Sequence, residues 1–400
     1  MNRIKVLFIL RDFEQGGIAR TLVNLCSELD MSRVCADVFV CNPSGIFKNN
    51  LQNCTVLPYN FLLRLLTCNY RKEHGFVKFT AAIVKLLRHL IIKLVDKDLL
   101  LEYAERRCAE KFKNGYDVLW ACSEDVPAKI AEYSSSKSSK VLWIHNNYTY
   151  CFENIKKRGL PNYSVYDRIV CVSRWSSEAL QKVLWEDCNL QLHKKVDFLY
   201  NIVNTAEIME HIKSSCDDPL FSNQKFTIIS VGRLAWEKNF ESIPQIALTL
   251  QQAGFDFVWY IIGGGSDQMR DIIESEIRKN GMEQKVILLG TKSNPYPYIA
   301  KSDVLVVSSR YETYPTVVNE AKVLGVPVIS TNILGIEEIL SPSEGWICHP
   351  EEIADILIDI MKNGVPEKMR KTENFIEHNH SVMEKFEQIL LELKNGKVSS

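Results

Sequence analysis

Residues 308–330, SSRYETYPTVVNEAKVLGVPVIS, decide how the chain is predicted to fold. They follow the apolar run Val304–Val307, which predicts a buried strand. Pro315 can open a helix in its first turn, and the run Val326–Ser330 after that helix predicts another strand. A strand, a helix and a strand in succession are typical of a parallel α/β sheet.

The same alternation continues towards the N-terminus. Earlier in the second half of the chain, apolar runs predict strands at Phe226–Val231, Phe257–Ile262 and Lys285–Leu289. Ser266 and Gly281 have the residue types expected at the N-cap and just after the C-cap of a helix between two of these strands. This half therefore predicts one complete doubly wound α/β domain.

The first half of the chain shows a second series of this kind. Its predicted strands are Ile4–Leu10, Val34–Cys41, Asp117–Ala121, Val141–Ile144, Arg168–Val172 and Val196–Leu199. One helix is predicted over about Gly17–Leu29, and another from the N-cap Ser173 to about Leu184. The sequence thus predicts an α/β protein with two doubly wound domains.

The length and composition agree with two domains. The chain has 400 residues, of which 46% are hydrophobic and 24% charged, as in soluble globular proteins. We expect domains at residues 1–203 and 204–379, with a last helix at about 380–395 that could pack back on the first domain. Residues 1–200 carry 29 Lys and Arg against 21 Asp and Glu, whereas residues 201–400 carry 19 against 28. This asymmetry suggests that the domains face different partners.

Several classes of protein are not expected. The N-terminal apolar run Val6–Leu10 ends at Arg11, so no secretion signal is predicted. No run approaches the ~18 uninterrupted apolar residues of a membrane span. The twelve cysteines form no CxxC pair and no Cys/His metal spacing. We therefore expect a cytoplasmic protein with reduced thiols and no metal site.

One basic segment interrupts the α/β pattern. Residues 61–113 hold 12 Lys and Arg against 6 Asp and Glu, and within them lies an apolar stretch, about residues 77–95, that contains Lys85, Arg88 and Lys93. One interpretation is a packing helix with a solvated basic face. The other is a surface that docks on anionic lipid headgroups at the inner face of the plasma membrane. The sequence leaves both open.

Ligands of open α/β sheets bind beyond the carboxyl ends of the strands, so the loops there carry the candidate residues. The loop GRLAWEKN at residues 232–239 holds Arg233 and Lys238. Two cations in this place could neutralise a diphosphate without a metal. The alternative is a pair of surface charges partnered by Glu237, but the position at the end of a strand favours a ligand.

Two glycine-rich loops also end predicted strands. Gly16 and Gly17 follow the first strand, where they would let backbone approach a ligand or simply form a tight turn. The run Gly263, Gly264 and Gly265 resembles part of a dinucleotide fingerprint. Position 268, however, is Gln where a third glycine belongs, so nicotinamide binding is rejected. We expect only that a ligand passes close to this loop.

The acidic residues of the opening stretch and one histidine complete the candidates. Glu312 lies just before the predicted helix and Glu320 within it. Carboxylates there are stabilised by the helix dipole and can accept hydrogen bonds from sugar hydroxyls, although acids are common at helix starts. His145 ends the strand Val141–Ile144, where it could contact a sugar or phosphate or be a packed structural histidine.

Taken together, these motifs resemble the retaining glycosyltransferases of family 4. The resemblance is carried by the glycines near residue 16, His145, GRLxxEKN at 232–239, the glycines at 263, and Glu-x7-Glu in SSRYETYPTVVNEA. The stretch NPYPYIAKSDVLVVSSRYE is similar to bacterial enzymes that build capsule, O-antigen or exopolysaccharide. This family has the GT-B fold, two Rossmann-like domains facing a cleft, with the donor bound by the C-terminal domain and the acceptor on the N-terminal side.

The resemblance also implies a role for each residue. Arg233 and Lys238 would bind the diphosphate of a nucleotide-sugar donor, and Glu320 the ribose. Glu312 would contact the transferred sugar, and the backbone of Thr316 and Val317 would line the diphosphate or sugar. From the first domain, Gly17 would approach the donor and His145 the reaction centre. Thr313, Tyr314 and Pro315 replace the family's Gly-aromatic-Gly, a departure that bears on sugar specificity.

The implied function is retaining transfer of a sugar from a nucleotide-sugar, UDP- or GDP-linked, to a glycan or polyprenyl-diphosphate-linked acceptor. It requires no metal cofactor and no nucleic acid. Two alternatives stay open at this point: a nucleotide-sugar epimerase on the same fold, and a non-catalytic scaffold. The sequence names neither the sugar, the acceptor, the linkage nor the oligomeric state.

Overall fold

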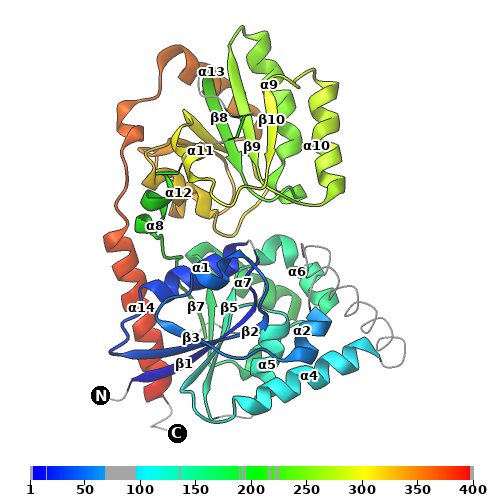
Figure 1. The fold of residues 1–400 in the computed structure, drawn as a ribbon, viewed down its shortest axis with the longest axis vertical. Coiled ribbons are helices and arrows are strands. Elements are labelled where there is room, and N and C mark those ends of the chain that lie inside the picture. Colours follow the sequence, from blue (N-terminus) through cyan, green and yellow to red (C-terminus); the bar gives the residue numbers. More distant parts are fainter. Residues whose placement is uncertain are drawn as a thin grey trace. The chain divides into compact units, whose positions relative to one another are not determined.

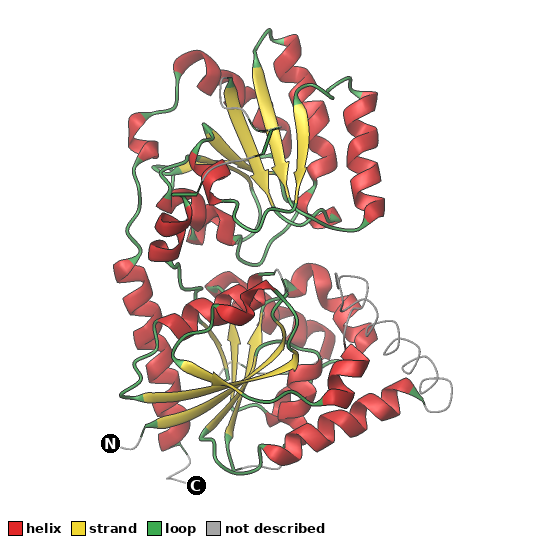
Figure 2. Cartoon of the chain, viewed as in Figure 1, coloured by secondary structure: helices red, strands yellow, loops and turns green. Residues whose placement is uncertain are grey.

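The computed structural model describes residues 3–396 apart from residues 15, 68–95, 135–136, 189, 191, 193–194, 215–217, 220 and 222–224. The chain divides into two compact units (Figure 1). Unit 1 consists of residues 1–202 and 380–400, and unit 2 of residues 203–379. Each contains one sheet with helices on both faces (Figure 2).

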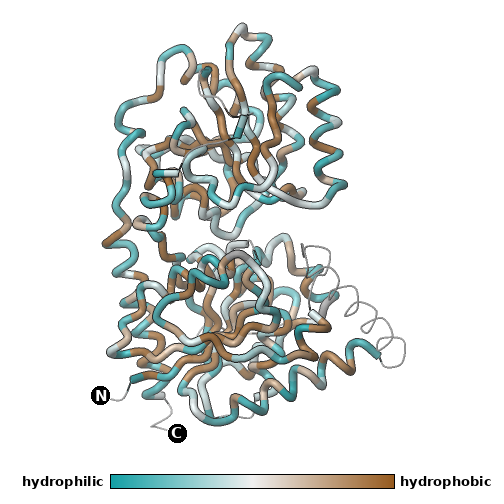
Figure 3. Tube along the Cα trace, viewed as in Figure 1, coloured by the Kyte–Doolittle hydropathy of each residue, from teal (hydrophilic) through white to brown (hydrophobic). Residues whose placement is uncertain are grey.

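The sheet of unit 1 has seven parallel strands in the order β3-β2-β1-β4-β5-β6-β7. Their bounds are β1 Ile4–Asp12, β2 Val34–Asn42, β3 Cys54–Val56, β4 Val118–Ala121, β5 Ser139–Ile144, β6 Arg168–Cys171 and β7 Val196–Phe198. The order reverses between β1 and β4, which lie side by side. The inner strands are apolar along nearly their whole length because helices cover both faces (Figure 3).

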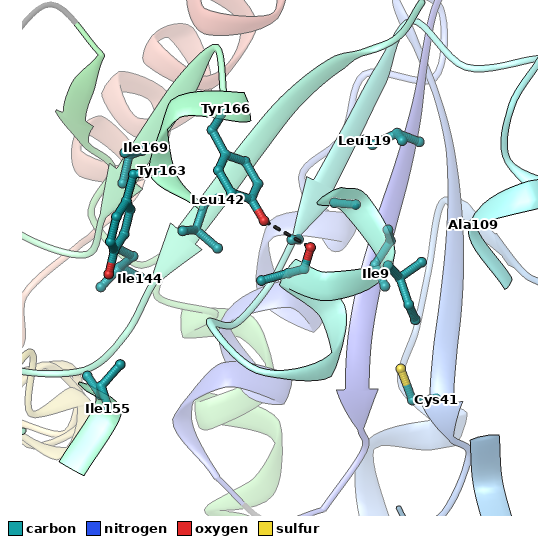
Figure 4. Close-up of a cluster of buried hydrophobic side chains, with 14 of the residues drawn as sticks. Ile9, Cys41, Ala109, Leu119, Leu142, Ile144, Ile155, Tyr163, Tyr166 and Ile169 are labelled. Atoms are coloured by element: carbon teal, nitrogen blue, oxygen red, sulfur yellow. Dashed lines mark hydrogen bonds between the residues drawn. The ribbon is translucent and has the colours of Figure 1, made fainter. Parts of the chain in front are cut away.

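The described helices of unit 1 are α1 Gly17–Ser27, α2 Phe61–Thr67, α4 Lys97–Lys111, α5 Val126–Tyr133, α6 Tyr148–Arg158 and α7 Arg174–Cys188, with the 3₁₀ turns η1 Ile46–Asn49 and η3 Tyr163–Val165. Their apolar faces and the sheet enclose a continuous core. Figure 4 shows part of it, where the buried Tyr166 hydroxyl donates to the carbonyl of Ala128 at 2.9 Å.

The last helix, α14 Ile376–Asn395, packs on unit 1 from residue 380 onward. The Phe386 ring lies 5.2 Å from that of Trp120 and 6.2 Å from that of Phe8. The Arg33 guanidinium contacts the Glu387 carboxylate at 2.7 Å. Aromatic burial and an ion pair therefore both attach this helix to the strands of unit 1.

Unit 2 contains six parallel strands in the order β10-β9-β8-β11-β12-β13. Their bounds are β8 Phe226–Val231, β9 Phe257–Ile262, β10 Val286–Gly290, β11 Val304–Val307, β12 Val328–Thr331 and β13 Gly345–Cys348. Its helices are α8 Thr205–His211, α9 Ile243–Gln252, α10 Asp267–Lys279, α11 Tyr296–Ala300, α12 Thr316–Val323 and α13 Ile353–Asn363, with the 3₁₀ turns η4 Trp236–Lys238, η5 Phe240–Ser242, η6 Ile336–Glu338, η7 Pro350–Glu352 and η8 Glu367–Arg370. Here the order reverses between β8 and β11.

The predicted α/β class with two doubly wound domains is confirmed, and all eleven predicted strands are present within a few residues of their predicted bounds. The Ser266 hydroxyl caps α10 by accepting from the Met269 amide at 3.2 Å, and Gly281 has φ of 65°, as its predicted place after the helix requires. Pro315, however, is the N-cap of α12 rather than a residue of its first turn.

Three further observations concern the membrane and thiol predictions. None of the helices in the described ranges is both long and apolar enough to cross a bilayer. The basic stretch at 77–95, with Lys85, Arg88 and Lys93, lies outside the described residues, so its docking on lipid stays a prediction. The described cysteines are free thiols.

Candidate functional site

The carboxyl ends of β8 and β11 define the candidate site of unit 2. The two strands pair side by side, with Ile229 opposite Leu305, so the loops that follow them are neighbours. These are the loops 232–239 and 308–315, which contain most of the ligand-binding residues predicted from the sequence. The strand order reverses between β8 and β11, and ligands of open α/β sheets bind at such a point of reversal, the switch point.

An ion pair joins the two loops. The Lys238 ammonium contacts the Glu312 carboxylate, and the Ser309 hydroxyl donates to the same carboxylate oxygen at 2.7 Å. The Lys238 and Glu312 side chains are only 19% and 13% exposed. A charged group that is largely removed from water needs a partner of opposite charge, and Lys238 and Glu312 are partners of this kind. The structure thus brings together two residues to which the resemblance gave separate roles.

Arg233 has a different setting on the same loop. Its guanidinium pairs with Glu237, the partner that the alternative interpretation named, but its side chain is 72% exposed. Exposed pairs of this kind contribute about 0–1 kcal/mol. The Arg233 guanidinium can therefore leave Glu237 for an anionic ligand at little cost. The Lys238 ammonium has three N–H donors, so it can contact a phosphate while still bonded to Glu312.

Helix α12 presents its N-terminus next to this pair. Thr316 and Val317 form its first turn, where backbone N–H groups have no carbonyl partner within the helix and are suited to bind an anion. Glu320 lies in the second turn and is half-buried. The Asn319 amide donates to the Tyr314 hydroxyl at 3.0 Å, which orders the residues before the helix.

The glycine run after β9 is explained by close contacts within the protein itself. A Cβ on Gly263 would lie 1.7 Å from the Gly232 carbonyl oxygen, and one on Gly264 would lie 2.4 Å from the Thr291 hydroxyl. A Cβ on Gly265 would lie 2.2 Å from the Leu234 carbonyl oxygen. Gly263 and Gly265 therefore allow loop 232–239 to lie against the loop after β9, and Gly264 leaves room for the Thr291 side chain, whether or not a ligand passes nearby.

Gly16 and Gly17 show the opposite behaviour in unit 1. They stand at the N-cap and first position of α1, and a Cβ on either would meet no atom within 4 Å. The described residues around them therefore impose no steric need for glycine. Open space at the N-terminus of a helix is compatible with the predicted approach of a ligand.

His145 follows β5 in unit 1, as predicted. Its ring lies 4.8 Å from the Trp143 ring, and its Nε2 atom is buried without a hydrogen-bond partner in the described part of the chain. Burial lowers the pKa of His145 to about 3, so the imidazole is neutral at physiological pH. It can exchange hydrogen bonds with a hydroxyl but cannot supply positive charge to a phosphate.

Glu124, which follows β4, was not predicted from the sequence. The residue is 7% exposed, Oε1 accepts from the Asn146 amide at 3.1 Å, and Oε2 has no partner within the described structure. Burial raises the pKa of Glu124 to about 7. Its place after a strand could have indicated it, since an acid follows the apolar run 117–121. No group of three or more His, Cys, Asp or Glu within the described residues could hold a metal ion.

Comparison with known proteins supports a ligand-binding site in unit 2. Residues 212–379 match the family model described as Glycosyl transferases group 1. An uncharacterized 41.2 kDa protein in the cps region of Klebsiella pneumoniae is 24% identical over 360 residues, 87% of this chain and 86% of that protein. The N-acetylgalactosamine-N,N'-diacetylbacillosaminyl-diphospho-undecaprenol 4-alpha-N-acetylgalactosaminyltransferase of Campylobacter jejuni is 30% identical over 139 residues, 35% of each chain.

Solved structures resemble the whole chain. Anabaena Alr3699/HepE in complex with UDP and glucose has a TM-score of 0.68 at 16% identity, covering 96% of this chain and 100% of that one. TarM has a TM-score of 0.68 at 14% identity, covering 98% and 99%. The predicted GT-B fold is therefore confirmed, and the match to the group 1 glycosyltransferase model falls within unit 2.

Proposed function

We propose that this protein is a retaining glycosyltransferase that moves a sugar from a nucleotide-sugar to a glycan or lipid-linked acceptor in cell-surface polysaccharide biosynthesis. The observation that carries the proposal is the Lys238–Glu312 ion pair, which joins the two loops at the switch point of a glycosyltransferase group 1 domain. The cps-region relative and the Campylobacter transferase support the biosynthetic setting.

The cations of this site would stabilise the leaving group. As the bond between sugar and diphosphate breaks, negative charge develops on the phosphate oxygens, and Lys238, Arg233 and the first-turn amides of α12 are suited to receive it. Glu312 would then exchange part of its contact with Lys238 for hydroxyls of the transferred sugar. Glu320 would hold the ribose.

We propose a front-face displacement without a covalent intermediate. The sequence offers no obvious carboxylate nucleophile, so the leaving phosphate would take the proton of the acceptor hydroxyl and the new bond would keep the anomeric configuration. Gly16, Gly17 and His145 are assigned to the donor sugar on the resemblance alone. A neutral His145 is suited to bonding a sugar hydroxyl.

UDP is the first nucleotide to test. The name of the Anabaena structure includes UDP and glucose, and the two-cation loop would serve UDP or GDP equally. A nucleotide-sugar epimerase is not favoured, since the matched family and the Campylobacter relative are described as transferases.

The direct experiment is to screen UDP- and GDP-sugars for stabilisation of the protein against heat and then for release of nucleoside diphosphate. We expect one donor to raise the melting temperature and to be consumed, with the product showing the same anomeric configuration as the donor by NMR. Isomerised nucleotide-sugar without diphosphate release would indicate an epimerase instead. Binding of every donor without turnover, even with added glycan acceptors, would indicate a scaffold.

A lipid-linked acceptor would place the enzyme at a membrane surface. We propose that the basic stretch at 77–95 provides this contact on the inner leaflet, each basic residue contributing about 1 kcal/mol near anionic lipid. Changing Lys85, Arg88 and Lys93 to Glu should release the protein from vesicles that contain phosphatidylserine. Equal sedimentation of this variant and the parent with vesicles would remove the idea.

A further inference from the structure

Two cysteines of unit 1 face each other at the end of α1. Cys26 is the last residue but one of α1, and Cys54 is the first residue of β3. The Cys26 thiol donates a hydrogen bond to the Cys54 sulfur. Both are free thiols, but Cys26 is completely buried whereas Cys54 is half-buried. Two thiols in contact, one of them partly open to solvent, have the arrangement of a redox-reactive site.

Hydrogen bonds from Asn53 hold the two segments together. Its side-chain amide donates to the carbonyl oxygens of Cys26 and Ser27, at 3.2 Å and 2.9 Å. These carbonyls belong to the last turn of α1, where the regular hydrogen bonds of the helix end. Asn53 has φ of 55°, a left-handed conformation that asparagine tolerates better than most residues. Asn53 therefore fixes the start of β3 against the end of α1, directly beside the two thiols.

The hydrogen bond between the thiols gives them unequal acidity. Because Cys54 accepts the S–H of Cys26, its thiolate is stabilised and the pKa of Cys54 is lowered from its ordinary value. The same hydrogen bond, together with burial, raises the pKa of Cys26, so Cys26 keeps its proton. The thiolate is the form that reacts with an oxidant. Cys54 is therefore suited to react first, with a protonated Cys26 beside it.

We propose that Cys26 and Cys54 form a peroxide-reactive site that closes into a reversible disulfide, a property that goes beyond the proposed function. The Cys54 thiolate attacks the O–O bond of hydrogen peroxide, and its sulfur becomes a sulfenic acid as hydroxide leaves. The Cys26 sulfur then displaces the hydroxyl of the sulfenic acid, which leaves as water with the Cys26 proton. Two thiols and one peroxide thus give one disulfide and two waters, and two electrons pass from sulfur to oxygen.

The start of β3 can make the short movement that this bond requires, in which the two sulfurs approach to about 2.05 Å. β3 is three residues long, lies at the edge of its sheet and pairs with β2. Cys122 also lies near Cys26, but it is completely buried and its thiol donates to the Trp120 carbonyl at 3.7 Å. Peroxide therefore reaches Cys54 rather than Cys122.

Peptide mapping of the oxidised protein tests the proposal. The reduced full-length protein is treated with hydrogen peroxide, once under native conditions and once in urea, then blocked with N-ethylmaleimide and digested with trypsin. Cys26 and Cys54 fall in the peptides 21–33 and 49–64, each of which contains one cysteine. We expect a disulfide between these two peptides in roughly tenfold higher yield from the native protein than from the unfolded one. Dithiothreitol should separate them.

Variants assign the order of the two steps. Cys54→Ser should abolish the linked peptides. Cys26→Ala should leave Cys54 as a sulfenic acid, which dimedone labels more strongly than in the parent. Cys188→Ser is the matched control, because Cys188 at the end of α7 is also a half-buried free thiol of unit 1. It should give the parent yield of linked peptides.

Absence of the linked peptides from the native parent, or equal yields from the native and the unfolded protein, overturns the proposal. Linkage of Cys26 to Cys122 instead of Cys54 overturns it as well, as does dimedone labelling of Cys54 that is no stronger in Cys26→Ala than in the parent. None of these results depends on sugar transfer. Failure of the proposed function is recognised separately, as absence of diphosphate release from every nucleotide-sugar.

Discussion

The two units have the same strand order around their switch points but opposite chemistry there. In unit 2 the loops after β8 and β11 bring Lys238 against Glu312, with Arg233 close by in sequence. In unit 1 the corresponding ends of β1 and β4 carry acids: Asp12, the last residue of β1, whose pKa burial raises, and Glu124 in the loop after β4, whose pKa burial raises to about 7. Arg11 pairs with Asp125 at the same edge.

This difference shows how little the charge of a whole domain says about its site. The first half of the chain is basic and the second acidic, with 29 Lys and Arg against 21 Asp and Glu in residues 1–200 and 19 against 28 in residues 201–400. The switch point of unit 1 is acidic although the first half of the sequence is basic, and the switch point of unit 2 is cationic although the second half is acidic. A cationic switch point suits a diphosphate and an acidic one suits hydroxyl groups. The topology provides the place, and a few residues decide the ligand.

The largest expected effect is the loss of Lys238. Lys238→Ala removes the hydrogen-bond donor that we propose for the developing phosphate charge, which should lower kcat/KM for the nucleotide-sugar by roughly 10²–10³-fold. UDP affinity, measured by calorimetry, should also fall. If Lys238→Ala retains both within about threefold of the parent, the cationic switch point of unit 2 is not the donor site.

Lys285→Ala is a control matched for this prediction. Lys285 is also 19% exposed and also pairs with a carboxylate, that of Asp256 at 2.7 Å, but it precedes β10 at the amino ends of the strands. Its loss should leave UDP binding and kcat/KM as in the parent. A similar loss in both variants would mean that any broken ion pair in unit 2 damages the site.

The next largest effect is a difference between Glu320 and Glu312 in their contribution to UDP binding. Glu320→Ala removes the proposed ribose contact and should weaken UDP binding by roughly one to two orders of magnitude. Glu312→Ala should leave UDP affinity intact or improved, because Lys238 loses its competing carboxylate, while turnover falls. Calorimetry with UDP beside steady-state kinetics measures both. Equal loss of UDP binding in the two variants would show that Glu312 and Glu320 do not have separate roles and together maintain the structure at the start of α12.

The acidic switch point of unit 1 predicts a pH effect on stability. The folded state raises the pKa of Glu124 to about 7, so it holds this proton more tightly than the unfolded chain does. Stability is therefore lost as pH rises from the unfolded pKa, about 4.5, through about 7. Glu124→Gln should stabilise the protein at pH 8 by up to roughly 2–3 kcal/mol and change little at pH 4.

Denaturant unfolding at the two pH values measures this effect. Glu105→Gln serves for comparison, because burial raises the pKa of Glu105 to about 7 as well. Removing the Glu105 carboxylate should remove a separate part of the pH dependence of the free energy of unfolding. The same pH dependence in Glu124→Gln and the parent would contradict a protonated Glu124.

The smallest expected effect concerns metal ions. If Arg233 and Lys238 neutralise the diphosphate, excess EDTA should change donor turnover by less than about twofold. Loss of activity that Mg²⁺ or Mn²⁺ restores would show that the two cations do not suffice.

Much of the fold could be predicted because long apolar runs identify buried parallel strands. The bounds of β8, β9 and β11 agree with the prediction. The strands β3 and β13 were missed, since each is a short edge strand, CTV and GWIC, without a sustained apolar pattern. Such strands depend on the neighbour they pair with, which a local pattern does not reveal.

The candidate site was predictable in its residues but not in its contacts. Glu312 and Lys238 are 74 positions apart, and their contact follows from the pairing of β8 with β11. Glu124 was missed because its burial depends on the packing around β4 and β5. Conversely, the glycines at 263–265 were predicted to lie near a ligand, and the structure shows that the backbone of loop 232–239 requires Gly263 and Gly265 while the Thr291 side chain requires Gly264.

The central claim is that the switch point of unit 2 binds the nucleoside diphosphate, and a crystal structure with UDP tests it most directly. We predict diphosphate oxygens within hydrogen-bond distance of the Lys238 ammonium and of the Thr316 and Val317 amides, with the ribose at Glu320. UDP bound at the loops after β1 and β4, or in unit 2 away from Lys238, would contradict the claim.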